Sequence, residues 1–423
     1  MKFRFPSPFY IKMLKFNKTI LKNFSYLTLI QIITLLVPFI YYPYIIRKFS
    51  IDDYGLVIFI QSIVSLFSII IDFGFNIYAT RLVAENRNNK EQLNIIYSSV
   101  FCIKTVLFSV CFMFYFIFIL YNEKLHSHLV LSVLLYLLVI GEAFFSQWLY
   151  LGLEKVRISA LINLSSKIML LIIIFIGSNS FLGFYSFPIG LVSASIINAI
   201  LSTIIIRKIF NIKLIKVPIS EMWQHATGSY SFLLSRAMSA IIIKLNAYLI
   251  GNYIGFAQVA YYDLAERLMN LALIPINTLN QVIYPHVART RNFNITTRAI
   301  LFSLPIYIIF YPILYFFGED FIIIFAGSEL IESFNYLIVL YLIPIINIIV
   351  YFTGNCALIL INKKKEFNNS IYVSFIIYVL SIFILLISNN LTIYNLCWIL
   401  VMNSLIICLY RLYYSIKYIK LFL

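Results

Sequence analysis

Nine ionisable side chains lie inside long apolar stretches of this sequence, where charge is expensive. They are Asp72, Lys104, Glu142, Lys167, Arg236, Lys244, Asp263, Glu266 and Arg267. A charge at the centre of a bilayer costs at least about 2.5–3.5 kcal/mol, and such residues usually pair with one another or border a water-filled cavity. Lys104 and Lys167 have a simpler explanation, because their long stems can reach a membrane surface. The remaining charges are the first candidates for chemistry in this chain.

Two of the cations share one apolar stretch. Arg236 and Lys244 are eight residues apart, which is about two helical turns and about 80° around a helix, so both can border one cavity. No acid in that stretch neutralises them. The guanidinium fork suits phosphate oxygens especially well. The pattern favours an anion-binding site, with a structural pair between Arg236 and Asp72 or Glu142 as the alternative.

The acidic residues allow more than one interpretation. Asp263 and Arg267 are four residues apart, the spacing of an intrahelical salt bridge. That pairing would leave Glu266 without a partner. Asp72 and Glu142 are candidates for protonation coupled to transport, because burial raises the pKa of a carboxyl group. We favour the other interpretation, in which either acid is the partner of a cavity cation.

Two helical stripes of polar side chains occur at equivalent places in the two halves of the chain. The first consists of Gln61, Ser65, Ser68, Asp72 and Asn76, and the second of Asp263, Arg267, Asn270, Asn277 and Gln281. Each stripe recurs at helical spacing, and a polar stripe along a membrane helix cannot face lipid cheaply. The stripes predict a central cavity between two helix bundles. Hydrogen bonds that merely join neighbouring helices are the simpler alternative.

The elements that position these residues are apolar runs that fill almost the whole chain. Of 423 residues, 62% are hydrophobic and only 11% are charged, whereas a soluble domain has about 25% charged residues. Because a bilayer span needs about 20 mostly apolar residues, the runs predict an all-α integral membrane protein of about twelve transmembrane helices. These are about 24–46, 54–79, 97–121, 129–151, 158–177, 183–206, 228–250, 257–285, 299–318, 334–361, 369–388 and 391–416.

The basic residues orient these helices. With the N-terminus in the cytoplasm, 24 Lys and Arg residues fall on the cytoplasmic side and only Arg47, Lys48 and Lys124 on the external side. This asymmetry follows the positive-inside rule and predicts that both termini are cytoplasmic. The net charge of +16 is spread over short loops, and no nucleic-acid-binding motif accompanies it. We therefore expect a lipid bilayer and not nucleic acid as the partner.

A basic, polar connection near the midpoint separates two related halves. Residues 83–88 (VAENRN) close the second span, and residues 287–292 (VARTRN) close the eighth. Such a repeat predicts two six-helix bundles. The expected units are a basic cytoplasmic tail at 1–22, an N-terminal bundle at 23–206, a cytoplasmic linker at 207–227, a C-terminal bundle at 228–416 and a cytoplasmic tail at 417–423.

Motifs for hydrolysis and metal binding are missing. The sequence has no GxxxxGK(S/T) phosphate loop, no HExxH and no GxSxG, so we expect neither an enzyme nor a bound cofactor. His126 and His128 lie in a short external loop without a third ligand, which favours a solvated pair over a metal site. The five cysteines all lie in apolar runs and are interpreted as small hydrophobes.

Several short segments resemble those of Wzx-type O-antigen flippases. PYIIRKFS at 43–50, followed by Tyr54-Gly55, is similar to the first external loop of that family. DFGFN at 72–76, with ATR at 79–81 and Asn86-Arg87, resembles the end of its second span. QWLYLGLE at 147–154 is similar to the exit of the fourth span, and Phe317-Gly318 fits the end of the ninth. The resemblance covers nearly the whole chain and is strongest over its first 160 residues.

The resemblance implies a MATE-like fold and a place in the multidrug, oligosaccharidyl-lipid and polysaccharide exporter superfamily. It implies a multi-pass protein of the bacterial cytoplasmic membrane that moves an undecaprenyl-pyrophosphate-linked oligosaccharide to the outer leaflet. It further implies a cation-lined cavity, which agrees with Arg236, Lys244 and Arg267, coupling to a proton or sodium gradient, and neighbours among the membrane proteins of polysaccharide assembly.

Two other functions compete with this expectation. A drug or small-molecule exporter of the same fold predicts a more apolar cavity. A membrane polysaccharide polymerase needs a large external loop with catalytic residues, but the longest external loop expected here has about 15 residues. The sequence therefore favours a transporter over an enzyme.

Overall fold

A computed structural model describes residues 36–419, apart from the side chains at positions 231, 232, 235, 236, 282, 285 and 419. The tail predicted at 1–22, the first part of the span predicted at 24–46, and residues 420–423 of the tail predicted at 417–423 lie outside the described residues. The structure is helical from residue 36 to residue 48, and this segment continues into the first bundle.

The first bundle contains short and long helices. They are α2 (Ile51–Asp72), α3 (Phe75–Glu85), α4 (Lys90–Tyr121), α5 (Glu123–His126), α6 (Leu129–Tyr136), α7 (Val139–Phe144), α8 (Gln147–Gly152), α9 (Val156–Gly177), the 3-10 turn η2 (Gly183–Tyr185) and α10 (Ser186–Lys208). The span predicted at 129–151 is therefore built from three consecutive short helices, α6, α7 and α8. The expected all-α fold is confirmed.

The remaining helices are longer. They are α11 (Ile219–Tyr253), α12 (Phe256–Thr290), α13 (Asn294–Ala326), the 3-10 turn η3 (Ser328–Leu330), α14 (Ser333–Leu340), α15 (Leu342–Thr353), the π-helix η4 (Gly354–Ile359), α16 (Lys364–Ile387) and α17 (Ile393–Ile419). The helix α11 begins inside the linker expected at 207–227, and α17 extends beyond the bundle boundary expected at 416.

Nine helical stretches of the described chain are long and apolar enough to cross a membrane. The helices α11 and α12 have 35 residues each, but they carry most of the buried charges of the second half. Outward-facing residues such as Phe302, Phe316 and Ile324 are 71%, 73% and 81% exposed, as expected for side chains that contact lipid. The count of twelve spans remains a prediction, because the first span is only partly described.

The second predicted span breaks beside its acidic residue. Helix α2 ends at Asp72, and the next two residues adopt left-handed conformations, with φ of 49° at Phe73 and 80° at Gly74. A left-handed conformation is strained for Phe73 and natural for glycine. The chain then resumes as α3, so Asp72 lies at a bend and not within a straight helix.

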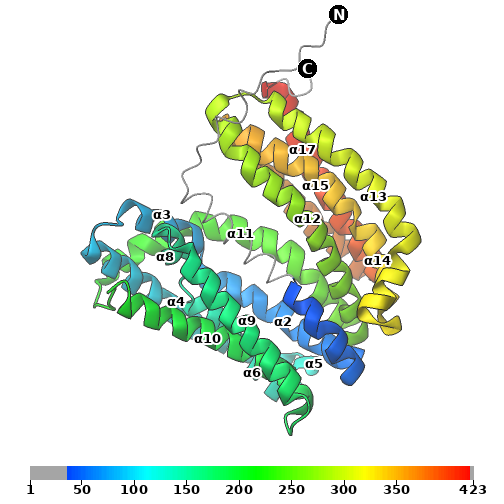
Figure 1. The fold of residues 1–423 in the computed structure, drawn as a ribbon, viewed down its shortest axis with the longest axis horizontal. Helices are drawn as coiled ribbons and strands as arrows, with labels where there is room; N and C mark the ends of the chain where they lie inside the picture. The colour runs from blue at the N-terminus through cyan, green and yellow to red at the C-terminus, as the bar shows by residue number, and fades with distance from the viewer. Residues whose placement is uncertain (1–35, 420–423) are drawn as a thin grey trace, which may run out of the picture.

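The two halves diverge from a common corner (Figure 1). At that corner α2 packs against α11 and α12. The backbones approach so closely that a Cβ on Gly55 would lie 1.8 Å from the carbonyl oxygen of Phe256. The Tyr42 hydroxyl donates to the carbonyl of Ala260 at 3.0 Å, and Tyr54 donates to Asp263. We call these contacts the external closure, since they lie at the predicted external end of the helices.

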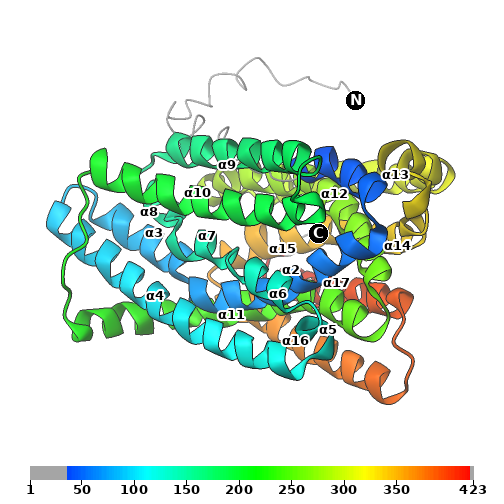
Figure 2. The same ribbon diagram turned by 90° about the horizontal axis from the view of Figure 1, so that it is seen from below.

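The loop that precedes α6 also joins the two halves. Asn122 donates to Asn252 at 3.1 Å, and the Lys124 ammonium group donates to the carbonyl of Gly251 at 2.7 Å. Partial burial lowers the pKa of Lys124. From this end the helices α13, α15 and α17 lead away from α4, α9 and α10 toward their predicted cytoplasmic ends (Figure 1), and Figure 2 shows α4 and α10 of the first bundle from below. The structure is thus closed at the predicted external end and divergent at the other.

Helix α11 does not belong to one bundle alone. It contacts α2, α3 and α4 of the first bundle, and also α12, α16 and α17 of the second. Near its N-terminus a Cβ on Gly228 would lie 2.5 Å from the Tyr78 hydroxyl of α3. Figure 1 shows α11 running beside the first bundle across the angle between the two. The expected C-terminal bundle at 228–416 therefore begins with a helix that bridges both halves.

Candidate functional site

A pocket of about 220 Å³ lies where the two predicted stripes meet. We call it the central pocket. Its polar lining comes from α2, α11 and α12 and consists of Gln61, Ser62, Ser65, Ser68, Lys244, Asp263, Glu266 and Arg267. Three members of the first stripe thus face two members of the second across the bundle interface. Among the predicted cations, Lys244 and Arg267 both line this pocket.

Arg267 and Asp263 form the intrahelical pair that their spacing predicts. The Arg267 Nε atom lies 2.6 Å from the Asp263 carboxylate. The same oxygen of Asp263 accepts a hydrogen bond from Tyr54 at 2.7 Å, so one carboxylate joins α12 to α2. The Asp263 side chain is 10% exposed and that of Arg267 23%. Arg267 therefore retains access to the pocket while it is held in place.

Glu266 lies between the central pocket and a second cavity. Its carboxylate is buried and lines both spaces. The ion pair of Arg267 is made with Asp263, so the negative charge of Glu266 faces the pocket that also contains Lys244. The backbone of Arg236 lies on α11, but its side chain lies outside the described residues, and its anion-binding role remains a prediction.

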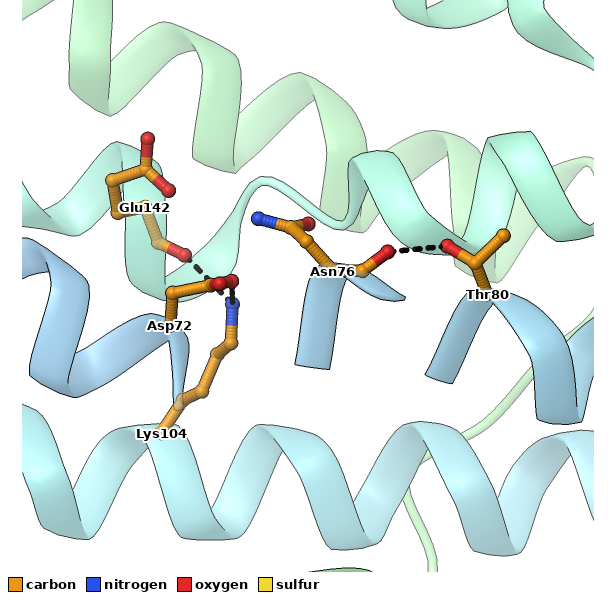
Figure 3. A network of polar contacts seen from close by, with 5 residues as sticks. All are labelled: Asp72, Asn76, Thr80, Lys104 and Glu142. Atoms are coloured by element: carbon orange, nitrogen blue, oxygen red, sulfur yellow. Dashed lines mark hydrogen bonds and ion pairs between the residues drawn. The ribbon is translucent and has the colours of Figure 1, made fainter. Parts of the chain in front are cut away.

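Lys104 connects Asp72 to the backbone of Glu142 inside the first bundle, while the Glu142 carboxylate points away from Asp72 (Figure 3). The Lys104 ammonium group lies 3.4 Å from the Asp72 carboxylate and donates to the backbone carbonyl of Glu142 at 3.0 Å. Lys104 is 1% exposed, so the explanation that it extends to a membrane surface is wrong. The chain leaves α7 in an extended conformation at Phe145, and Lys104 thereby satisfies a carbonyl in its last turn.

Asn76 continues the same region on α3. Its backbone carbonyl accepts a hydrogen bond from the Thr80 hydroxyl at 2.7 Å, and Thr80 also reaches the carbonyl of Trp148 at 3.3 Å (Figure 3). Neither Asp72 nor Asn76 lines the central pocket. The first stripe therefore divides near the bend. Gln61, Ser65 and Ser68 face the pocket, whereas Asp72 and Asn76 pack within the first bundle.

The second half encloses a larger cavity of about 730 Å³. We call it the second-bundle cavity. Its polar lining includes the predicted residues Glu266, Asn270, Asn277 and Gln281 of α12, together with Ser239, Asn347, Ser374, Asn403, Ser404 and Arg411. The second stripe thus lines both spaces: Asp263 and Arg267 line the central pocket, and Asn270, Asn277 and Gln281 line the second-bundle cavity. The amides of Asn347 and Asn403 were not predicted, although an isolated amide in an apolar run is the signal that marks them.

Arg411 lines the second-bundle cavity, although it was not among the predicted cavity cations. The sequence pattern assigns it to the cytoplasmic flank, but it is 5% exposed and lines the cavity wall. Its guanidinium group donates to Ser370 at 3.0 Å and to the carbonyl of Val350 at 3.2 Å, and it lies 4.0 Å from the ring centroid of Phe367. None of the ion pairs among the described residues includes Arg411. Its location within the predicted span 391–416 is the signal that could have revealed it.

The fold matches solved structures of membrane transporters. One is the lipid II flippase MurJ in an inward closed conformation, with a TM-score of 0.72 and 15% identity over 94% of this chain and 87% of that one. Another is an inward-facing multidrug resistance MATE family transporter of the MOP superfamily, with a TM-score of 0.65 and 12% identity over 91% and 98% of the two chains. The protein therefore has the MATE-like fold that was expected.

The sequence comparison identifies the family. The model of the family described as "Polysaccharide biosynthesis protein" matches residues 20–291, and the chain belongs to this family. An O-antigen transporter of Shigella dysenteriae is 29% identical over 351 residues, which cover 76% of this chain and 82% of that protein. The resemblance to Wzx-type flippases is thus confirmed. The protein is a multi-pass protein of the bacterial cytoplasmic membrane.

Proposed function

We propose that this protein moves a polyprenyl-pyrophosphate-linked oligosaccharide across the cytoplasmic membrane by alternating access. One observation carries the proposal: polar residues of both bundles, including Lys244 and Arg267, face one pocket beside the external closure, whose Tyr54 bonds to Asp263 of the pocket lining. The helices of the two bundles diverge from that closure toward their predicted cytoplasmic ends (Figure 1), as a protein that alternates between two arrangements of its bundles requires of one of them. The relatives named as an O-antigen transporter and a lipid II flippase support the substrate class.

The physical advantage lies in separating the two parts of the substrate. Moving sugars and a pyrophosphate through hydrocarbon would leave many polar groups without hydrogen bonds, each at a cost of about 2–7 kcal/mol. A hydrated passage between the bundles removes that barrier, while the polyprenyl tail stays in lipid. The protein then acts as a transporter that forms and breaks no covalent bond.

The cations supply the attraction for the pyrophosphate. Lys244 and Arg267 line the central pocket, and we assign them the role of anion anchors together with Arg236. Asp263 already holds one edge of Arg267, which fixes the guanidinium without removing it from the pocket. Asp263 and Glu266 in the same lining offset the charges of Lys244 and Arg267, so that the anion is bound weakly enough to leave.

Coupling to a proton or sodium gradient is part of the proposal. Asp72 and Lys104 form a buried pair at the bend between α2 and α3, and protonation of Asp72 would remove the attraction between them. Such a change at a bend can alter the relative direction of two helices. Glu142 and Glu266 are the other acidic candidates, because the first lies in this network and the second faces both cavities.

A drug exporter of the same fold is the second candidate, since one structural neighbour is a multidrug transporter. An exporter of cationic drugs needs an acidic or apolar pocket, whereas here two cations face two acids in the central pocket. A polysaccharide polymerase is disfavoured by the short external connections, such as the six residues between Ala326 and Ser333. Neighbouring proteins of polysaccharide assembly remain expected partners.

The proposal is tested in a strain that lacks this protein and accumulates its lipid-linked oligosaccharide. The wild-type chain should restore surface polysaccharide, and Lys244→Gln should lower it by about tenfold, because a charge-assisted hydrogen bond contributes about 1.5–3 kcal/mol. Lys244→Arg is the matched control that keeps the charge. Normal surface polysaccharide without this protein would exclude the flippase role. Full activity of Lys244→Gln would remove Lys244 from the anion site.

A further inference from the structure

The side chains that line the second-bundle cavity suit the binding of sugars better than the packing of helices against one another. Five of its lining side chains are carboxamides from three helices: Asn270, Asn277 and Gln281 of α12, Asn347 of α15 and Asn403 of α17. A carboxamide offers both donors and acceptors, as sugar hydroxyl and N-acetyl groups do. The aromatic rings of Tyr262 and Tyr351 lie in the same lining and provide apolar faces. Pure helix packing would not require amides on three sides of an open space.

One of these amides is unsatisfied by the protein itself. Asn403 is 6% exposed, and its side-chain oxygen has no hydrogen-bond partner among the described residues. A buried polar atom without a partner costs about 1–3 kcal/mol. This oxygen is itself closed off from the cavity space, so it shows that Asn403 is buried at a cost and does not by itself identify a ligand. The half-buried amides of Asn270, Asn277 and Asn347, which line the cavity, carry the inference.

The length of the cavity also fits an oligosaccharide. Its lining on α12 extends from Glu266 to Gln281, sixteen residues that span about 22 Å along a helix. Its volume of about 730 Å³ lies in the range of about 300–1,000 Å³ that is typical of small-molecule sites. Because Glu266 lines this cavity and the central pocket, the two spaces meet at one residue.

We infer that the second-bundle cavity is a glycan subsite, in which the amides of Asn270, Asn277, Asn347 and Asn403 bind hydroxyl or N-acetyl groups of the transported oligosaccharide. This inference rests on the proposed function and extends it, because it assigns the sugars to the second bundle and leaves the pyrophosphate to the cations of the central pocket. Glu266 lies at the junction of the two. The substrate would therefore lie asymmetrically, with its sugars on the side of α12 that faces α15 and α17.

The first experiment locates the sugars. A photo-crosslinking amino acid is placed at Asn347 in the second-bundle cavity, at Ser65 in the central pocket, or at Val379, which is 42% exposed on α16 and lines neither space. After irradiation of cells that produce the native lipid-linked oligosaccharide, the protein is purified and any attached sugar is detected by periodate oxidation and hydrazide labelling. We expect label at positions 347 and 65 and none at 379.

Label at 65 alone would overturn the glycan subsite and leave the flippase proposal intact. Label at neither position would overturn both.

The second experiment separates binding from folding. Asn403→Leu and Asn347→Leu each remove one amide. We expect each to lower the labelling obtained with the photo-crosslinking amino acid at position 65 by about five- to tenfold, and to lower the surface polysaccharide by the same factor. Thermal stability of Asn403→Leu should be unchanged or higher, because its buried oxygen loses no protein partner. Ile407→Leu, in the same cavity wall, is the volume-matched control. Wild-type labelling and transport in both amide variants would overturn the inference, and so would a loss that merely follows a loss of thermal stability.

Discussion

The Lys104 ammonium group lies 3.4 Å from the Asp72 carboxylate, and the two side chains are only 1% and 4% exposed. The pair connects α4 to the bend that separates α2 from α3. Lys104 also donates to the backbone carbonyl of Glu142, so a single ammonium group joins three helical segments of the first bundle. A buried pair of this kind contributes little net stability, but removal of one partner is strongly destabilising because the other charge stays buried.

Lys104→Leu should therefore destabilise the protein by about 3–5 kcal/mol, because Asp72 would remain buried beside a hydrocarbon side chain. The measurement is the thermal unfolding of the purified protein in detergent. The double variant Asp72→Asn with Lys104→Leu should recover most of that loss, since it removes both charges. A single variant as stable as the wild type would show that the pair has no structural role.

Gly55→Ala should open the external closure. The new Cβ would lie 1.8 Å from the carbonyl oxygen of Phe256, so α2 and α12 must separate, and overpacking of this kind costs about 1–3 kcal/mol. The reporter is the disulfide formed by Asn122→Cys and Asn252→Cys, whose native side chains are joined by a hydrogen bond across the closure. We expect its yield in membranes to fall by about tenfold.

Gly141→Ala is the control for that measurement. Its Cβ would meet the Ser195 hydroxyl at 2.5 Å, which creates a milder clash, with a side chain, within the first bundle but not between the bundles. It should reduce stability and leave the disulfide yield near the wild-type value. If Gly55→Ala and Gly141→Ala lower the yield equally, the close approach at Gly55 does not control the closure.

Tyr54→Phe tests the polar part of the same closure. Tyr54 donates to Asp263 at 2.7 Å, and a hydrogen bond to a charged group contributes about 1.5–3 kcal/mol. Its loss should weaken the link between α2 and α12 and lower the disulfide yield by about tenfold. It should also increase the labelling, from the external side, of a Ser65→Cys variant in the central pocket by thiol reagents. Tyr42→Phe, which loses a hydrogen bond to a neutral carbonyl, should have a smaller effect. A larger effect of Tyr42→Phe than of Tyr54→Phe would contradict the importance of the charge on Asp263.

Gly354→Ala should displace Arg411 from its place in the cavity wall. A Cβ at position 354 would lie 2.5 Å from a terminal nitrogen of Arg411, and Arg411 is held there by Ser370 and the carbonyl of Val350. We expect surface polysaccharide to fall by about tenfold, with a smaller loss for Arg411→Lys, which keeps the charge but not the fork. Unchanged transport in Gly354→Ala would show that the position of Arg411 is unimportant.

The helical membrane architecture could be predicted because the bilayer acts locally on each segment. A run of about 20 apolar residues must form a helix in lipid, since its backbone has no other hydrogen-bond partners. The stripe of Gln61, Ser65 and Ser68 was likewise visible from helical spacing, and the structure brings it opposite Asp263 and Arg267. Helix ends were less predictable, as the early start of α11 at Ile219 shows.

The partners of the buried charges could not be predicted, because they depend on how distant helices pack. Composition and spacing are enough to indicate that the chain spans a membrane, which residues are buried at a cost, and that Arg267 can reach Asp263 one turn away. Helix packing alone brings Lys104 to Asp72, Tyr54 to Asp263 across 209 residues of sequence, and Arg411 to the wall of a cavity. The reason is physical: spacing along a helix fixes which side chains share a face, but the choice of the opposing face follows from the packing of all the helices together.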